Sequence, residues 1–80
     1  MQPEAIRSLI ANHLAVPMDA VRDSAGFATD LGADSLDMIE LAMRFEEELD
    51  ISIADDEGEA CATIRDALNL LNRKVLSKTG

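Results

Sequence analysis

Apolar residues in this chain of 80 residues recur at steps of three and four, and no stretch alternates apolar with polar residues over the length of a strand. Side chains with this spacing lie on one face of an α-helix, where they can pack against other helices. The pattern therefore predicts an all-α fold. A chain of this length forms one small core, so we expect residues 1–80 to be a single domain.

Four segments have the periodicity of a helix. The first two are residues 3–14 and residues 35–49. A short acidic helix is expected at about residues 55–61, and a last helix at about residues 64–76. Residues 15–34 then form a long connection between the first two helices. Connections of this length are uncommon in compact domains unless they have a function.

Two pairs of residues mark helix beginnings. Asp34 is placed to cap the second helix, with Asp37 three positions later as the acidic half of a capping box. Thr63 and Asp66 have the same spacing at the start of the last helix. Ser35 then becomes the first residue of the second helix, where we expect its hydroxyl to be exposed and fixed in position.

The second helix carries two apolar stripes, although a helix with one buried face needs only one. The stripe suited to the core contains Met38, Leu41, Ala42, Phe45 and Leu49. The other is interleaved with acids and contains Leu36, Ile39 and Met43. A partner surface is the preferred interpretation for Leu36 and Met43, because methionine adapts to several apolar counterparts. Ile39 is left open between the core and that surface.

Acidic residues are concentrated in the middle of the chain. The net charge is −9, and twelve of the 16 acids lie within residues 30–60. Such a surface repels nucleic acid and anionic lipid head groups and attracts basic proteins. No apolar run approaches the ~20 residues that span a bilayer. We therefore expect neither nucleic-acid binding nor membrane insertion; the alternative for the acids is a solvated face that keeps a small protein in solution.

The number of cysteines and the first residues of the chain indicate the expected cellular compartment. Cys61 is the only cysteine, so it forms no disulfide within the domain, and its apolar setting favours a small core residue over a nucleophile. The first residues lack the basic-then-apolar pattern of a secretory signal. We expect a cytoplasmic protein, and a monomer by default.

Neither a hydrolase nor a metal site is predicted. The only histidine, His13, is expected to be a surface or packing residue of the first helix, and Ser35 is not in a G-x-S-x-G turn. An EF-hand around Gly58 would require Ile53 and Ile64 as ligands of a hard cation. We therefore expect no catalytic residue and no metal-ligating set, although loose association of divalent ions with the acids stays open.

The surroundings of Ser35 suit a residue that is modified. The N-terminus of a helix has unpaired N–H groups and the positive end of the dipole, which favour an anion such as a phosphodiester. The alternative is that Asp34 and Ser35 only cap a helix.

A longer motif decides between these interpretations. It runs Asp30-Leu31-Gly32-Ala33-Asp34-Ser35-Leu36-Asp37 and is followed by Glu40-Leu41 and Phe45-Glu46-Glu47-Glu48-Leu49. Phe27 precedes it, and Thr63-Ile64-Arg65-Asp66-Ala67 opens the last helix. Together these residues resemble the acyl carrier proteins of bacterial fatty-acid synthesis. The resemblance implies a four-helix bundle with a long loop between helices I and II and a short helix III.

The resemblance also implies a cofactor and partners. Ser35, flanked by Asp34 and Leu36, would carry 4′-phosphopantetheine, installed from coenzyme A by a phosphopantetheinyl transferase that uses magnesium. The thiol of this arm would hold acyl groups as thioesters, and the chain would have no catalytic turnover of its own. Basic surfaces of fatty-acid or polyketide synthase enzymes and acyltransferases would dock on Asp37, Glu40, Met43, Glu47 and Glu48. The acyl chain would lie between helices against Met38, Leu41, Phe45, Ile53, Ile64 and Leu68.

Departures from the family pattern keep other functions open. Ala54 stands where many relatives have proline, and Gly58 and Cys61 replace a better helix former and a bulkier aliphatic residue. A specialised carrier for a polyketide, a dedicated lipid or an aminoacyl pathway is one alternative. The other is an unmodified acidic interaction module in which Ser35 is only a cap.

Overall fold

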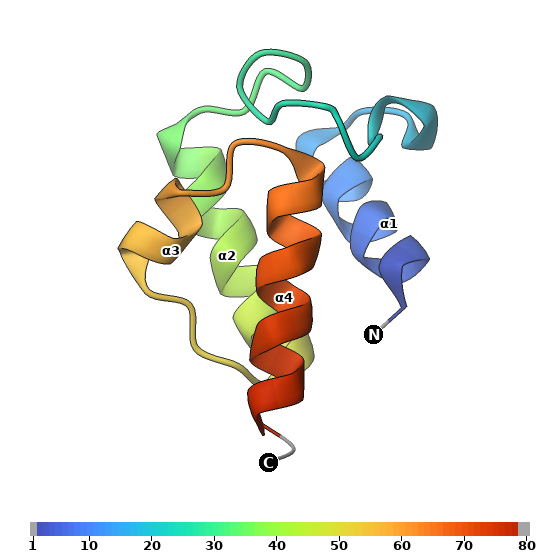
Figure 1. Ribbon diagram of the computed structural model, residues 1–80. Coiled ribbons are helices and arrows are strands. Elements are labelled where there is room, and N and C mark those ends of the chain that lie inside the picture. The colour runs from blue at the N-terminus through green and yellow to red at the C-terminus, as the bar shows by residue number, and fades with distance from the viewer. Residues whose placement is uncertain (1, 79–80) are drawn as a thin grey trace.

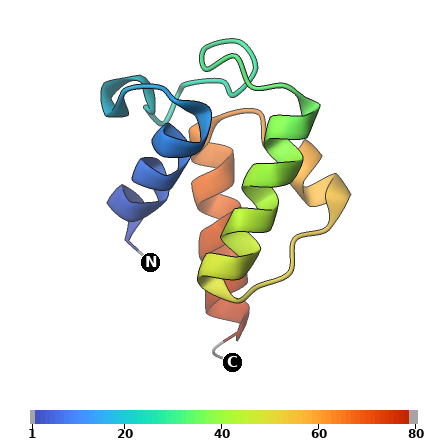
Figure 2. The same cartoon turned by 180° about the vertical axis from the view of Figure 1, so that it is seen from behind.

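The computed structural model describes residues 2–78, and over these residues the chain is helical without a strand (Figures 1 and 2). The elements are α1 (Pro3–Leu14), the 3₁₀ turn η1 (Met18–Ala20), α2 (Ser35–Leu49), α3 (Asp55–Glu59) and α4 (Ile64–Lys78). The expected all-α fold, with a long loop after α1 and a short third helix, is confirmed. No helix in this part of the chain is long and apolar enough to cross a membrane.

The bounds of the first two helices coincide with the ranges expected from periodicity, whereas α3 ends two residues early, at Glu59. The cap of the next helix accounts for the early end. The backbone N–H groups of Ala62 and Thr63 donate to the carboxylate of Asp66 at 3.0 and 3.1 Å, so this stretch turns toward α4. At its other end α4 extends two residues beyond the expected range.

The core lies between α1, α2 and α4, and α3 lies beside α2 at the edge of this group (Figure 1). Its most deeply buried side chains come from all three long helices and the loop: Ile10, Val21, Leu41, Ile64 and Leu71. Leu70 is also buried, at 6% exposure, although Ile64 and Leu68 were the only residues of this helix named as lying between helices. Leu68 is half-buried at the margin of the core.

The long connection is anchored along its length. Val21, Phe27 and Leu31 bury their side chains in the core. Gly26 forms an isolated antiparallel bridge with Thr63, and the N–H of Phe27 donates to the carbonyl of Ala62 at 3.0 Å. These contacts fasten the loop to the start of α4 and thereby fix where α2 begins.

Gly58 and Gly32 give a test of local stability. Gly58 lies inside α3, and a Cβ there meets no atom within 4 Å. Glycine in a helix costs about 0.5–1 kcal/mol relative to alanine, so Gly58→Ala is expected to raise the free energy of unfolding in urea by about that amount. Gly32→Ala is the matched control, because its Cβ also meets open space but its φ of +68° is left-handed. It should lower the free energy of unfolding; equal effects would contradict the backbone argument.

Asp66 should make stability depend on pH. Hydrogen bonds from the backbone N–H groups of Thr63 and Ala62 lower the pKa of this carboxyl below its ordinary value of 3.8. A lowered folded-state pKa gives stability that is present above the ordinary pKa and is lost as pH falls through the folded value. In urea unfolding, Asp66→Asn should therefore be less stable than the unsubstituted chain at neutral pH, and the difference should shrink below pH 3.8. A difference that does not change with pH would be inconsistent with this cause.

Candidate functional site

Ser35 is the first residue of α2, and its side chain is exposed. A complete capping box holds this end of the helix: the N–H of Asp37 donates to the Asp34 carboxylate at 2.9 Å, and the N–H of Asp34 donates to the Asp37 carboxylate at 3.1 Å. The predicted cap is therefore present. It fixes the backbone around Ser35 and leaves the hydroxyl at the positive end of the helix dipole.

The second apolar stripe of α2 faces solvent. Leu36 is 62% exposed, Ile39 56% and Met43 53%. This settles the open interpretation of Ile39, which is a surface residue and not part of the core. Glu40, Glu47 and Glu48 are exposed on the same helix, and Asp37 is half-buried. Single exposed apolar residues are common, but three that recur along one helix among carboxylates form a surface suited to an apolar and basic partner.

Ser35 also lines a groove of about 870 Å³. The walls of the groove come from the long loop, from α2 and from the segment that contains α3. Its apolar lining includes Phe27, Met38, Ile39, Ala42, Met43 and Ile53. The exposed hydroxyl is therefore continuous with an apolar channel between α2 and α3.

A second, smaller apolar pocket, which is also partly open, adjoins the groove, because Met38, Ala42 and Ile53 line both. Its volume is about 30 Å³, room for about one or two water molecules. Four of the six residues expected around an acyl chain line this smaller pocket: Met38, Leu41, Phe45 and Ile53. Ile64 and Leu68 line neither the groove nor the smaller pocket.

Cys61 and Glu46 are among the groove residues that the sequence did not predict. Cys61, expected in the core, is half-buried and lines both the groove and the smaller pocket; burial raises the pKa of its thiol, and Asp66 adds to the rise. Glu46 accepts a hydrogen bond from the N–H of Ile53 at 2.9 Å and so fastens the segment after α2 to that helix. The position of Glu46 in the acidic run gave no signal of this internal role.

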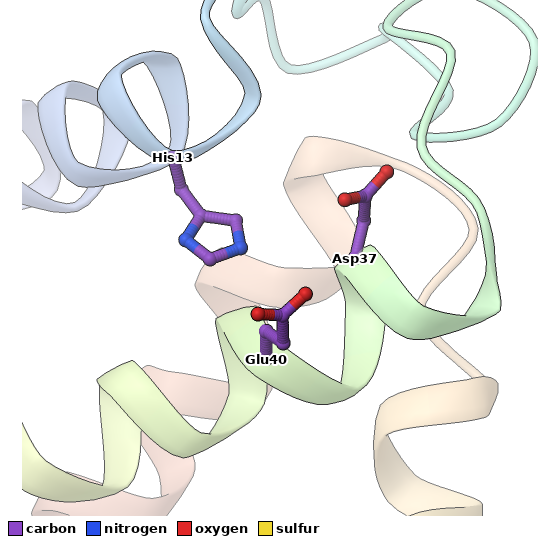
Figure 3. Close-up of side chains that lie close together, drawn as sticks. All are labelled: His13, Asp37 and Glu40. Atoms are coloured by element: carbon purple, nitrogen blue, oxygen red, sulfur yellow. The ribbon is translucent and has the colours of Figure 1, made fainter.

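His13 lies closer to α2 than the sequence suggests. It comes from the last turn of α1, and its half-buried ring lies opposite the carboxylates of Asp37 and Glu40 (Figure 3). One ligand atom from each of these three side chains lies within 4.8 Å of the others. His13 was expected to be a surface or packing residue of the first helix, and its nearness to these two acids was not predicted.

Comparison with known proteins identifies the family. The family model described as "Phosphopantetheine attachment site" matches residues 4–71. A protein of Zymomonas mobilis subsp. mobilis described as "Acyl carrier protein" is 46% identical over 69 residues, which are 86% of this chain and 88% of that protein. This chain belongs to the acyl carrier protein family. Its cofactor is accordingly 4′-phosphopantetheine, and the resemblance noted in the sequence is confirmed.

The geometry around Ser35 fits this cofactor. A phosphodiester needs an accessible hydroxyl with free space around it, and Ser35 is exposed at a helix terminus. A flexible, partly apolar arm also needs a surface on which to lie, which the adjoining groove offers. The residues of this acyl carrier protein therefore suit a covalently attached arm.

Proposed function

We propose that this acyl carrier protein carries its 4′-phosphopantetheine on Ser35, holds acyl intermediates there as thioesters, and delivers them to enzymes of fatty-acid synthesis or a related pathway. The observation that carries the proposal is the position of Ser35, exposed at the first residue of α2 and lining the groove. The match to the attachment-site family over residues 4–71 supports it. When bound, the arm supplies the thiol that is acylated.

The chain's own contribution begins at the start of α2. The backbone N–H groups of Asp34 and Asp37 each donate to the other residue's carboxylate in the capping box. The turn around Ser35 is therefore held in one conformation. The helix dipole favours the negative charge of a phosphodiester on the Ser35 oxygen. Ser35 acts here as an attachment point, and no turnover by the carrier itself is required.

The groove is the proposed resting place of the acyl chain between visits to enzymes. Met38 and Ile53 line both the groove and the smaller pocket, so movement of these two side chains would widen the passage between the two spaces. Each methylene that leaves water for such a site gains about 0.8 kcal/mol. Leu41 and Phe45, at the inner end, would contact a longer chain.

The proposed docking face is the exposed side of α2. Asp37, Glu40, Glu47 and Glu48 would meet the basic surfaces of a phosphopantetheinyl transferase, synthase enzymes and acyltransferases, while Leu36 and Met43 fill apolar depressions. Exposed ion pairs each contribute only about 0–1 kcal/mol, which allows a carrier to dissociate after each transfer. Long-range attraction still accelerates the encounter. A cytoplasmic monomer suits this shuttle.

Loading with the cofactor tests the proposal directly. The full chain, incubated with coenzyme A, magnesium and a phosphopantetheinyl transferase, should gain the mass of one phosphopantetheine. Ser35→Ala should gain none, because it lacks the accepting oxygen, while Ser24→Ala, another exposed serine beside the groove, should load like the unsubstituted chain. Intact-mass spectrometry measures all three. An unchanged mass, in conditions that load a known carrier, would favour the unmodified interaction module.

The docking face is tested by charge reversal. Glu40→Lys and Glu47→Lys should each slow loading at low salt by up to about fivefold, as expected for the loss of one exposed ion pair. The effect should diminish as salt screens the charges. Glu4→Lys makes the same charge change on α1, and its loading rate should change less. Equal slowing by all three variants would show that net charge, not the exposed side of α2, governs the encounter; circular dichroism checks that helicity is retained.

A further inference from the structure

One imidazole and two carboxylates lie close together where α1 faces α2: those of His13, Asp37 and Glu40 (Figure 3). His13 belongs to the last turn of α1, and the two acids are three residues apart on α2, which places them on neighbouring positions of one face. Their ligand atoms lie within 4.8 Å of one another. The sequence separates these residues by more than twenty positions, so only the fold brings them together.

The distances are close to those of a metal site. Imidazole nitrogen and carboxylate oxygen bind zinc at about 2.0–2.2 Å, so two ligands of one ion lie at most about 4 Å apart. Rotation of exposed Glu40 about its side-chain bonds can close the remaining gap. His13 and Asp37 are half-buried, and the exposed side of the cluster leaves a path for an ion and its water molecules.

One carboxylate is already held in place. An oxygen of Asp37 accepts the N–H of Asp34 in the capping box, so the orientation of this carboxylate is fixed before any ion arrives. Hydrogen bonds of this kind, made to a ligand from outside the coordination sphere, raise metal affinity. The two carboxylates also balance the charge of a divalent ion.

We propose that His13, Asp37 and Glu40 bind a divalent transition-metal ion of the Zn²⁺ type, with water completing its coordination. The imidazole decides the class of metal, because nitrogen ligands suit zinc and its neighbours, whereas Mg²⁺ and Ca²⁺ prefer oxygen alone. A bound ion ties the end of α1 to the start of α2. It also occupies two acids of the proposed docking face, so zinc would compete with basic partners there.

The single histidine makes the test specific. The full chain, without an affinity tag and with Ser35 unmodified so that no added thiol binds zinc, is titrated with zinc chloride by calorimetry and by NMR of the imidazole protons. The His13 signals should shift in step with binding. His13→Gln and Glu40→Gln should each weaken zinc binding by at least about tenfold, since even indirect partners of a ligand contribute that much. Glu59→Gln removes the same charge from an exposed site outside the cluster and should leave the affinity within about twofold.

Two results would overturn the proposal. The first is zinc binding that His13→Gln does not weaken, or that leaves the imidazole signals of the unsubstituted chain unmoved, because the ion would then bind elsewhere on the acidic surface. The second is tighter binding of Mg²⁺ than of Zn²⁺ to the unsubstituted chain, which would indicate an oxygen-only site. The NMR measurement needs no substitution and stays decisive if a variant fails to fold, and neither result depends on whether Ser35 carries the cofactor.

Discussion

Burial of the long loop against the helices is the constraint on which the rest of this structure depends. A connection of this length between two helices costs considerable conformational entropy, about 1–2 kcal/mol per fixed residue. Val21, Phe27 and Leu31 offset part of that cost by entering the core, and the bridge between Gly26 and Thr63 pairs backbone groups that would otherwise lie unpaired at the start of α4. Because the loop is held, α2 begins at one residue, and the backbone that carries the Ser35 hydroxyl is held in place by the capping box.

The second helix has one apolar face in the core and a second apolar face that is exposed to solvent. Leu41, Phe45 and Leu49 point into the core, while Leu36, Ile39 and Met43 remain largely exposed among acids. Exposing the second set gains nothing for folding and favours association with other proteins. This combination suits the proposed docking face: the carboxylates would attract basic partners from a distance, and the small apolar contacts would give each complex a definite orientation without making it long-lived.

Local signals in the sequence predicted most of the fold because they act within one helix. The capping pair Asp34 and Asp37, the cap of Asp66, and the three- and four-residue spacing each involve neighbours in the chain, and the structure contains all of them. The inner face of α4 was less predictable, since Leu70 and Leu68 are both apolar and only the position of the other helices decides which is buried. The end of α3 depended likewise on competition with the next cap.

In the candidate site, too, the features that depend on neighbours in the chain could be predicted, and those that depend on the packing of distant segments could not. The exposure of Ser35 followed from its place in a cap, but the approach of His13 to Glu40 and the bond from Ile53 to Glu46 join segments whose proximity no local pattern encodes. The groove and the smaller pocket share a wall that also belongs to the core. In the proposed function, a side chain such as Met38 would have to pack well enough to stabilise the empty carrier and still move to admit an acyl chain. An unbranched, adaptable residue meets both demands better than a β-branched one.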